Sequence, residues 1–397
     1  MDHSFYTNNR LRLAQQYTTS PIILAGNDEV QRKADAAYEF TQESNFYYLT
    51  GIKEAGWTLV LLKDTPILIA PKRSESQVLF DGAVTLGDAA TTSGIKDVRT
   101  HDALSELLTQ LSLETDTVST LGKDPYWKHY GFALNPAQEK LRRVLKRRFK
   151  TVEDIRSTLS KLRSIKQPVE IECIRRAVTA SAASFESVKT LLPGMKRENE
   201  ITAQLSYDFL RASADSHAYT PIVAGGAHAC TLHYIQNDQP LPENGLVLID
   251  AGVQIQGYAS DITRTYATGT PTPRQTQVHA AVQKAHYEII SLITPGLELK
   301  GYSEKVDEIM KAAIDSLGLL KSKADYRKYF PHAISHGLGL DVHDSLGGHK
   351  AFMPGMILTV EPGIYIPEEG IGVRIEDDIL VTETGNENLS ARLSTDL

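Results

Sequence analysis

The chain has 397 residues, of which 41% are hydrophobic and 23% are charged, and its formal net charge is −7 at pH 7. This composition is typical of a folded soluble protein and disfavours an intrinsically disordered one. Proteins that bind nucleic acid usually carry a basic surplus or stripe, so the acidic balance argues against a nucleic-acid partner.

The first 150 residues alternate short apolar runs with polar, helix-like segments. Strands are expected at residues 21–25, 58–62 and 66–70, and helices at 102–112 and 136–149. Strands that alternate with helices predict an α/β domain. The basic stretch at 140–150 (KLRRVLKRRFK) fits the solvated face of one of these helices better than a nucleic-acid site.

The pattern changes near residue 158. A helical stretch meets a second amphipathic helix at Gln167-Pro168, where proline is tolerated as a helix start. Further helices are expected at 198–214, 274–293 and 302–317, while β-hairpins dominate from residue 246 onward. Helices and antiparallel strands in separate runs indicate an α+β fold. Because one hydrophobic core rarely grows to this length, we expect an α/β domain at residues 1–158 and an α+β domain at residues 159–397.

Cysteine content and apolar runs bear on the compartment. Cys173 and Cys230 are too few for a disulfide framework, which favours a reducing environment. No secretory signal is visible at the start of the chain, and the apolar runs at 59–62 and 66–71 are far too short to span a bilayer. We therefore expect a cytoplasmic protein without a membrane partner.

Two aspartates lie on the first C-terminal hairpin. Asp250 ends the apolar run 246–249, and Asp261 lies on the expected partner strand. A turn at residues 255–256 places them directly opposite each other, whereas a turn at 256–257 places them diagonally, offset by two. Both registers keep them on one face, because side chains alternate with period two. Two solvated aspartates would be the simpler interpretation, but the apolar run indicates burial, where paired carboxylates repel unless a cation or proton lies between them.

Two glutamates repeat this pattern on the second hairpin. A turn centred on residues 368–369 pairs Glu361 with Glu376, and alternation places Tyr365 and Arg374 on the same face. Taken alone, this arrangement fits a salt-bridged hairpin as well as a functional site.

Three histidines, His332, His336 and His343, lie between the hairpins in a glycine-rich loop, and His233 precedes the first hairpin closely enough to reach the same pocket. A lone histidine is more often a satisfied polar residue than a ligand. Imidazole is nevertheless a common neutral metal ligand and proton carrier, so a histidine cluster beside four paired carboxylates favours a metal site.

Two divalent ions fit this set of residues. The expected ligands are Asp250, Asp261, His336, Glu361 and Glu376. A mostly oxygen shell with one imidazole favours manganese, with zinc, cobalt or iron as substitutes. The absence of cysteine from the cluster argues against a structural zinc site. Two adjacent metals can activate a water molecule and clamp the oxygen it attacks, which predicts a hydrolase.

The same residues resemble the "pita-bread" metallopeptidases, and among them the aminopeptidase P and prolidase family. Five segments carry the resemblance, in order: 249–252 (IDAG), 260–264 (SDITR), 336–344 (HGLGLDVHD), 359–365 (TVEPGIY) and 373–377 (VRIED). It runs from about residue 160 almost to the end of the chain. Residues 40–51 (FTQESNFYYLTG) and 381–389 (VTETGNENL) also look like those of aminopeptidase P.

The resemblance implies a role for each site residue. Asp250 and Asp261 would hold one metal, His336 and Glu361 would hold the other, and Asp261 and Glu376 would bridge both. Glu361 would also relay protons from the attacking water. The remaining implied roles are substrate contact at the scissile bond for His233 and His343, ligand orientation and proton transfer for Tyr365 and Arg374, and a proline pocket for His332 and Tyr219.

The resemblance also implies an activity, namely release of the N-terminal residue that precedes a proline, by a homodimer or homotetramer acting on peptides. The loops at 345–354 and 367–370 are shorter than is typical of aminopeptidase P, which leaves an Xaa-Pro dipeptidase as an alternative. A non-catalytic pita-bread binding module is a remote one, because such modules typically lack the ligands. Methionine aminopeptidase is disfavoured by the large N-terminal domain, and a creatine-type amidinohydrolase by the complete carboxylate set.

Overall fold

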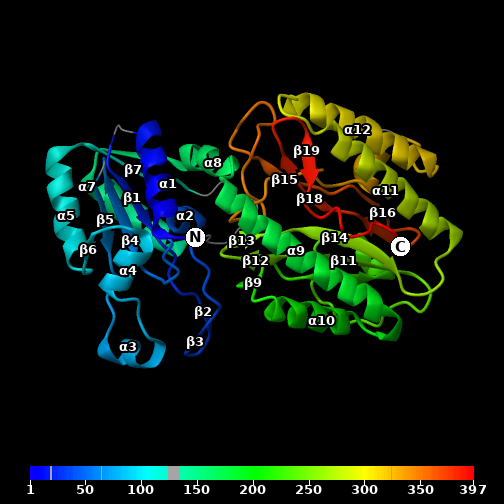
Figure 1. Ribbon diagram of the computed structural model, residues 1–397, viewed down its shortest axis with the longest axis horizontal. Coiled ribbons are helices and arrows are strands. Elements are labelled where there is room, and N and C mark those ends of the chain that lie inside the picture. The colour runs from blue at the N-terminus through cyan, green and yellow to red at the C-terminus, as the bar shows by residue number, and fades with distance from the viewer. Residues whose placement is uncertain (18–19, 64, 124–134, 323) are drawn as a thin grey trace. The chain divides into compact units, whose positions relative to one another are not determined.

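A computed structural model describes the chain except residues 18–19, 64, 124–134 and 323 (Figure 1). The chain divides into two compact units, Met1–Leu162 and Arg163–Leu397. The boundary predicted near residue 158 falls within α8 (Arg156–Ser164), a helix that contributes residues to both units. The domain limits of 158 and 159 stay a prediction.

The first unit is built on a six-stranded mixed sheet. In sheet order its strands are β6 (Asp97–Arg99), β5 (Thr65–Ile69), β4 (Thr58–Leu62), β1 (Ile22–Ala25), β7 (Thr117–Thr120) and β8 (Thr151–Asp154). Its helices are α1 (His3–Gln16), α2 (Ser44–Thr50), α3 (Glu75–Asp81), α4 (Leu86–Ser93), α5 (Ala103–Glu114) and α7 (Pro136–Arg148), and β2 (Gln31–Lys33) pairs with β3 (Ala36–Ala37). The five elements predicted here are confirmed as β1, β4, β5, α5 and α7.

Helices α5 and α7 bury their apolar faces against this sheet. Leu108 of α5 and Leu145 of α7 belong to one buried cluster with Ile23 and Val60 of the central strands. Burial of such side chains supplies about 1.5–3 kcal/mol each. The basic residues of α7 point away from this cluster, and its exposed side chains include Arg143. The α/β class predicted for the N-terminal domain is confirmed.

The second unit combines nested hairpins with long helices. Its strands are β9 (Ser216–His217), β10 (Ile222–Gly225), β11 (Leu246–Ala251), β12 (Val253–Ile255), β13 (Tyr258–Ala259), β14 (Ile262–Ala267), β15 (Ile357–Val360), β16 (Gly363–Ile366), β17 (Ile371–Arg374), β18 (Asp377–Val381) and β19 (Asn386–Asn388). Its further helices are α9 (Pro168–Leu191), α10 (Glu198–Arg211), α11 (Pro273–Leu292), α12 (Leu299–Ser316), α13 (Asp325–Tyr329), and the 3₁₀ turns η1 (Leu192–Gly194) and η2 (Gly226–Cys230). The predicted α+β class is confirmed.

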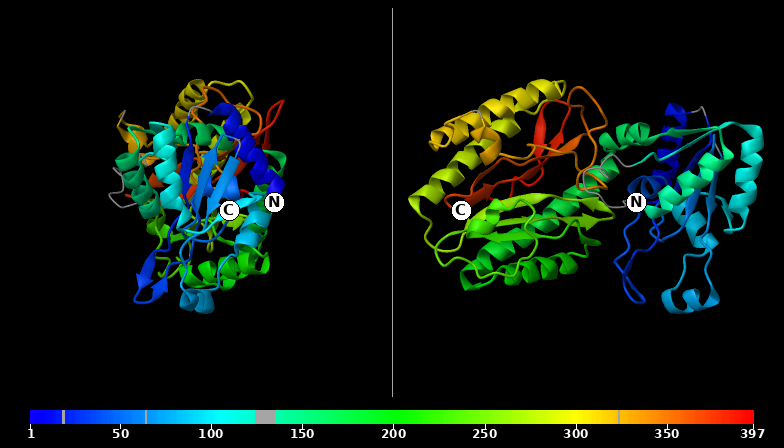
Figure 2. Two further views of the ribbon diagram at one scale, coloured as in Figure 1. Left: turned by 90° about the vertical axis from the view of Figure 1, so that its left-hand side faces the viewer. Right: turned by 180° about the vertical axis from the view of Figure 1, so that it is seen from behind.

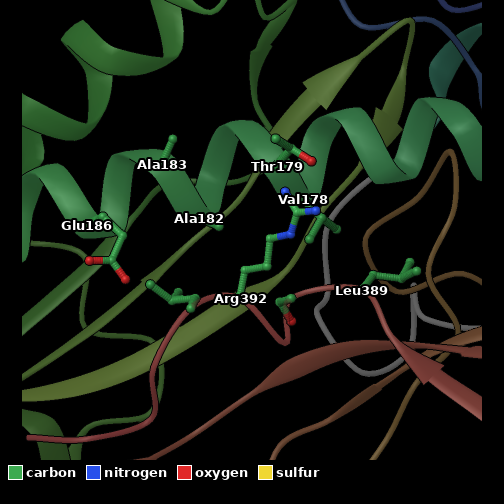
Figure 3. Close-up of a pocket in the computed structure, with 9 residues that line it drawn as sticks. Val178, Thr179, Ala182, Ala183, Glu186, Leu389 and Arg392 are labelled. Carbon is green, nitrogen blue, oxygen red and sulfur yellow. The ribbon is translucent and has the colours of Figure 1, made fainter.

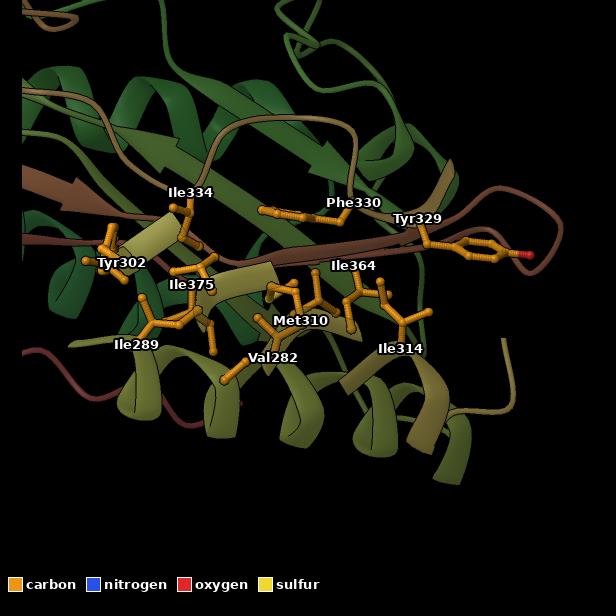
Figure 4. Close-up of a cluster of buried hydrophobic side chains, with 14 of the residues drawn as sticks. Val282, Ile289, Tyr302, Met310, Ile314, Tyr329, Phe330, Ile334, Ile364 and Ile375 are labelled. Atoms are coloured by element: carbon orange, nitrogen blue, oxygen red, sulfur yellow. The ribbon is translucent and has the colours of Figure 1, made fainter. Parts of the chain in front are cut away.

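Within this unit the strands lie between two helix pairs. Helices α9 and α10 cover one side and α11 and α12 the other, as two opposite views show (Figures 1 and 2). Val282 of α11 and Met310 of α12 pack with Ile364 and Ile375 of the second hairpin in a fully buried cluster (Figure 4). This apolar layer holds the back of the hairpin still, so that its opposite face can carry charged groups in fixed positions.

The structure decides between the two registers of the first hairpin. Asp250 lies opposite Thr263, so Asp250 and Asp261 are diagonal and the turn is at residues 256–257. Gln256 and Gly257 both have positive φ, 52° and 81°, as in the type I′ turns that match the twist of a hairpin.

The register predicted for the second hairpin is confirmed. Gly363 pairs with Arg374 and Val360 with Asp377, so Glu361 and Glu376 lie opposite each other between these two ladders.

No described helix combines the length and apolarity that crossing a bilayer requires.

Candidate metal centre

The structure brings three predicted ligands together at the meeting point of the two hairpins. Ligand atoms of Asp261, His336 and Glu376 lie within 4.8 Å of one another. Glu361 completes the group, since its Oε1 is 3.7 Å from His336 Nε2, which in turn is 3.5 Å from Asp261 Oδ2. Four of the five predicted ligands therefore face a common point.

Asp250 reaches this group through Tyr219. The Tyr219 hydroxyl is 2.5 Å from Asp250 Oδ1 and 2.5 Å from Asp261 Oδ1. A phenol has one hydrogen to donate, so it can satisfy only one of these oxygens at a time. The carboxylate oxygen that receives no hydrogen from Tyr219 requires a cation or a proton instead. Two carboxylates that bind the same metal ion would be arranged in this way.

Backbone pairing between the hairpins holds this geometry. Thr263 and Glu376 form an antiparallel bridge, with the Glu376 N–H donating to Thr263 O at 3.0 Å. The Thr263 hydroxyl also donates to Glu376 Oε2 at 2.7 Å, and Asp378 Oδ2 accepts the Asp261 N–H at 3.0 Å. These bonds orient two carboxylates from strands that are more than 100 residues apart in sequence.

The histidine loop is fixed to the second hairpin by similar bonds. The Thr359 N–H donates to His336 O at 2.9 Å, and the Glu361 N–H donates to Ile334 O at 3.0 Å. His336 Nδ1 lies 3.0 Å from Gly337 O, a distance at which Nδ1–H donates to the carbonyl. Nε2 then faces Asp261 and Glu361, and once the ring has lost its second proton the lone pair of Nε2 is directed as a metal ligand requires.

The charges of this cluster are poorly compensated by the protein alone. Burial raises the pKa of Glu376 well above its usual range, and the neighbouring Asp261 and Glu361 raise it further. Burial likewise raises the pKa of Asp250, although Arg374 opposes it, and raises the pKa of Glu361 to about 7. Like charges in a buried site resist joint ionisation, and divalent cations remove that resistance.

The negative charges of the neighbouring carboxylates also change the pKa of His336. Burial by itself acts to lower the pKa of its imidazole, but the hydrogen bond to Asp261 and the charges of Asp261 and Glu361 outweigh it and raise the pKa to about 9. A set of four carboxylates with one imidazole thus attracts positive charge and offers the oxygen-rich shell that hard dications prefer. The residues present fit two such ions.

A chain of hydrogen bonds runs outward from Asp250. Arg374 donates to Asp250 Oδ2 at 2.6 Å and to the Tyr365 hydroxyl at 2.8 Å, and this hydroxyl lies 2.9 Å from His332 Nε2. Burial, and then the charge of Arg374, lower the pKa of His332 to about 3, so its imidazole is neutral and Nε2 accepts from Tyr365. Burial raises the pKa of Tyr365 to about 12, which keeps its hydroxyl protonated.

The two remaining histidines lie outside the ligand cluster. The His343 ring centroid is 4.2 Å from that of His336, and His233 is exposed on the turn after η2. Partial burial lowers the pKa of His343, and the charges of His336 and His233 lower it further. Neither histidine is among the three described residues whose ligand atoms lie within 4.8 Å of one another, so the role of substrate contact stays a prediction for both.

The predicted proline pocket is the least supported part of the site. His332 contacts Tyr365 and the ring of Phe330, whereas Tyr219 contacts the two aspartates. Among the described contacts none joins His332 to Tyr219, so their shared pocket stays a prediction.

A separate shallow pocket lies between α9 and residues 389–393 (Figure 3). Its lining is mostly apolar, with Glu186 and Arg392 as charged residues, and it includes none of the predicted site residues. It is therefore not the metal centre.

Sequence reasoning missed two residues that orient the ligands, Thr263 and Asp378. A signal was present in each case, because Thr263 follows Asp261 by two residues and Asp378 follows Glu376 by two. Period-two alternation places each pair on one face of its strand. It also missed the buried group in which Arg163 donates to Asp344 at 3.1 Å while Lys166 lies 3.7 Å from the same carboxylate, for which no local pattern exists.

Gly252 is required by a close approach next to the aspartates. A Cβ at this position would lie 1.9 Å from Ser260 O and 3.1 Å from Tyr219 Cε1. We expect Gly252→Ala to destabilise the protein by about 1–3 kcal/mol through overpacking, and to lower metal content by displacing Tyr219. Urea unfolding and metal analysis measure both effects. Gly301→Ala, in open space on α12, serves as the matched control and should be neutral or stabilising; equal behaviour of the two variants would contradict the prediction.

Known proteins match both units. Residues 172–383 match "Metallopeptidase family M24", and residues 6–119 match "Aminopeptidase P, N-terminal domain". The chain is 34% identical to the Xaa-Pro aminopeptidase of Escherichia coli (strain K12), over 98% of this chain and 94% of that protein.

Solved structures agree with this result. The proline aminopeptidase P II from Yersinia pestis superposes with a TM-score of 0.86 and 34% identity, covering 100% of this chain and 98% of that one. The zinc-substituted aminopeptidase P from E. coli in complex with product gives a TM-score of 0.86 and 32% identity, covering 99% and 96%. Each likeness extends over nearly the full length of both chains.

Proposed function

Because the chain belongs to Metallopeptidase family M24, we propose that it hydrolyses the peptide bond between an N-terminal residue and a following proline, as an Xaa-Pro aminopeptidase. The observation that carries this proposal is the convergence of Asp261, His336 and Glu376 within 4.8 Å, with Glu361 and Asp250 beside them. A peptide substrate with proline in its second position is the partner that this activity requires.

Proline makes this bond a special substrate. Its nitrogen carries no hydrogen, and its ring occupies the leaving-group side of the bond. When bound, two divalent ions supply hydroxide near neutral pH and polarise the scissile carbonyl without needing that hydrogen. Asp250, Asp261, His336, Glu361 and Glu376 would hold these ions. Manganese is the proposed native metal because the shell is mostly oxygen, with zinc, cobalt and iron as substitutes.

The other roles follow from the geometry around the ligands. Glu361 is the proposed proton carrier, because its carboxylate lies in the ligand cluster, with Oε1 3.7 Å from His336 Nε2, beside the place where the attacking water would be held. Arg374 and Tyr365 orient Asp250 and His332 through their hydrogen bonds. We assign substrate contact to His233 and His343, which lie outside the ligand cluster, and the proline pocket to His332 and Tyr219.

Two further proposals concern the protein in the cell. A cytoplasmic location suits a chain whose two cysteines, Cys173 and Cys230, are both free thiols. A homodimer or homotetramer that acts on peptides, with neither a nucleic-acid nor a membrane partner, is the proposed assembly. Sedimentation of the purified chain at micromolar concentration tests the oligomeric state.

A metal-analysed assay on proline peptides tests the function. Xaa-Pro dipeptides and Xaa-Pro-Yaa-Zaa tetrapeptides are compared, each before and after chelation and manganese readdition. We expect cleavage of the tetrapeptide to release only its first residue, with loss of activity on chelation. Turnover confined to dipeptides would instead assign an Xaa-Pro dipeptidase, and no turnover with metal bound would leave a binding module.

His343 is expected to act on the substrate and not on the metal. His343→Ala should lower kcat by about 100-fold or more, the usual contribution of a positioned acid–base or polarising group, with metal content nearly intact. Steady-state kinetics and metal analysis of the same preparation measure both. His101→Ala, which changes an exposed histidine of the first unit, is the control; loss of metal in the His343 variant would make that residue a ligand instead.

A further inference from the structure

Glu198 is a fully buried carboxylate that the proposed mechanism does not use. It lies in the first turn of α10 and has no exposed surface. Four donors converge on it: Oε1 accepts from the Gly225 N–H at 2.9 Å and from His228 Nδ1 at 3.1 Å, and Oε2 accepts from the Tyr234 hydroxyl at 2.9 Å and the Gln239 N–H at 3.0 Å. Such saturation is what a buried anion needs, and it also fixes every group that donates.

All four donors belong to one segment, residues 225–239, which carries His233. Gly225 ends β10 and pairs with Val247 of β11, but beyond it and η2 the segment is turns and irregular chain, so no strand ladder holds residues 231–239. The Tyr234 ring stacks on the His228 ring at a centroid distance of 4.7 Å and an interplanar angle of 11°. The Glu198 N–H also donates to Gln239 O at 3.0 Å, so Gln239 both donates a hydrogen bond to Glu198 and accepts one from it. Glu198 thus joins the start, middle and end of the segment.

The segment packs directly on the metal-bearing hairpin. Tyr234 and Ala229 share a buried cluster with Tyr365, whose hydroxyl accepts from Arg374. The packing is tight, because a Cβ on Gly372 of β17 would lie 2.4 Å from Ala229 O. A shift of this segment would therefore move His233 relative to the metal ligands.

We infer that Glu198 is a positioning residue, which anchors the segment 225–239 and so places His233 against the substrate. This inference rests on the proposed function, in which His233 contacts the scissile bond. The carboxylate is needed because all four neighbours present hydrogens to it. A glutamine would keep one acceptor oxygen, but its amide group would turn hydrogens toward two donors.

Kinetics of three variants test the inference. Glu198→Gln should lower kcat by about 100-fold, the effect of a misplacement of about 1 Å, with KM changed little and both metals retained. Tyr234→Phe removes one of the four bonds at constant volume and should lower kcat by about 10-fold, at the low end of what an orienting residue contributes. If Glu198→Gln folds poorly, the kcat of Tyr234→Phe tests the inference in its place. Tyr326→Phe is the matched control and should retain full activity, because the Tyr326 hydroxyl donates to Asp307, which lies outside the segment 225–239.

A double-variant cycle distinguishes positioning from general damage. In a His233→Ala background, Glu198→Gln should cause no further loss of kcat, because the residue it positions is already absent. Losses that multiply would overturn the inference.

Hydrogen exchange separates this inference from the proposed function. Glu198→Gln should increase exchange in residues 225–239 and leave α11 unchanged. Unchanged exchange in 225–239 would overturn the anchoring. Faster exchange in a chain whose wild type cleaves no proline peptide would support the anchoring and overturn the proposed function instead.

Discussion

Glu376→Gln is expected to abolish hydrolysis of Xaa-Pro peptides and to weaken metal retention severely. Glu376 is 2% exposed, and its ligand oxygen shares a 4.8 Å cluster with Asp261 and His336. Glutamine preserves the shape and can keep the bond from Thr263, but it removes one of the negative charges that hold a dication. The loss of kcat/KM should exceed the about 10–100-fold that changes in outer orienting groups cause.

Metal analysis after equilibrium dialysis, together with kcat/KM, measures this prediction. Glu368→Gln is the matched control, because Glu368 lies in the turn of the same hairpin but is exposed and paired with Lys328. It should leave metal content and rate unchanged. In the absence of metal, the Glu376 variant should be at least as stable as the wild type, because it relieves repulsion within the cluster. Normal activity of this variant after exhaustive chelation would contradict the metal site.

Alternation explains why so much of this site could be predicted from the sequence. The second hairpin has one turn compatible with pairing Glu361 and Glu376, and the structure adopts that register. For the first hairpin two turns fitted equally well. The observed one requires a positive φ of 52° at Gln256, which its residue type does not favour. It also places Gly257 at the second turn position, and this signal, which disfavours a turn at Ile255-Gln256, was missed.

Features built from distant or polar contacts were not predictable in the same way. Arg163 meets Asp344 across 181 positions, and no periodic pattern links them. Helix α1 was missed because its buried face is partly polar. Asn9 donates to Tyr48 O at 2.8 Å, and Arg10 donates to Leu49 O at 2.6 Å, so hydrogen bonds replace the apolar stripe that marks an amphipathic helix.

The metal-free protein is expected to lose stability as pH rises from about 5 to about 9. The folded pKa of His336 is raised to about 9 from 6.5, so its contribution is fully present below pH 6.5 and is lost as pH rises through 9. The folded pKa of Glu361 is raised to about 7 from 4.5, because burial penalises its ionised form, so folding is most favourable while it is protonated and weakens between pH 4.5 and 7. Both groups act in the same direction, and each of the two pKa shifts corresponds to a loss on the order of 3 kcal/mol.

Bound manganese should reverse this dependence, because both groups must lose their protons before they can act as ligands. The loss from one group alone, on the order of 3 kcal/mol, corresponds to a fall of Tm of about 5–10 °C in a unit of this size. Calorimetry of the chelated protein at pH 5, 7 and 9 measures the total fall. The rise of Tm on adding manganese should then be small at pH 5 and large at pH 8, since the apparent affinity grows as protons leave. His336→Gln removes one titrating group and should flatten the curve of the metal-free protein above pH 6.5. A chelated wild type that is more stable at pH 9 than at pH 6 would contradict the raised pKa values of His336 and Glu361. It would also remove the electrostatic argument for a metal centre formed by these residues.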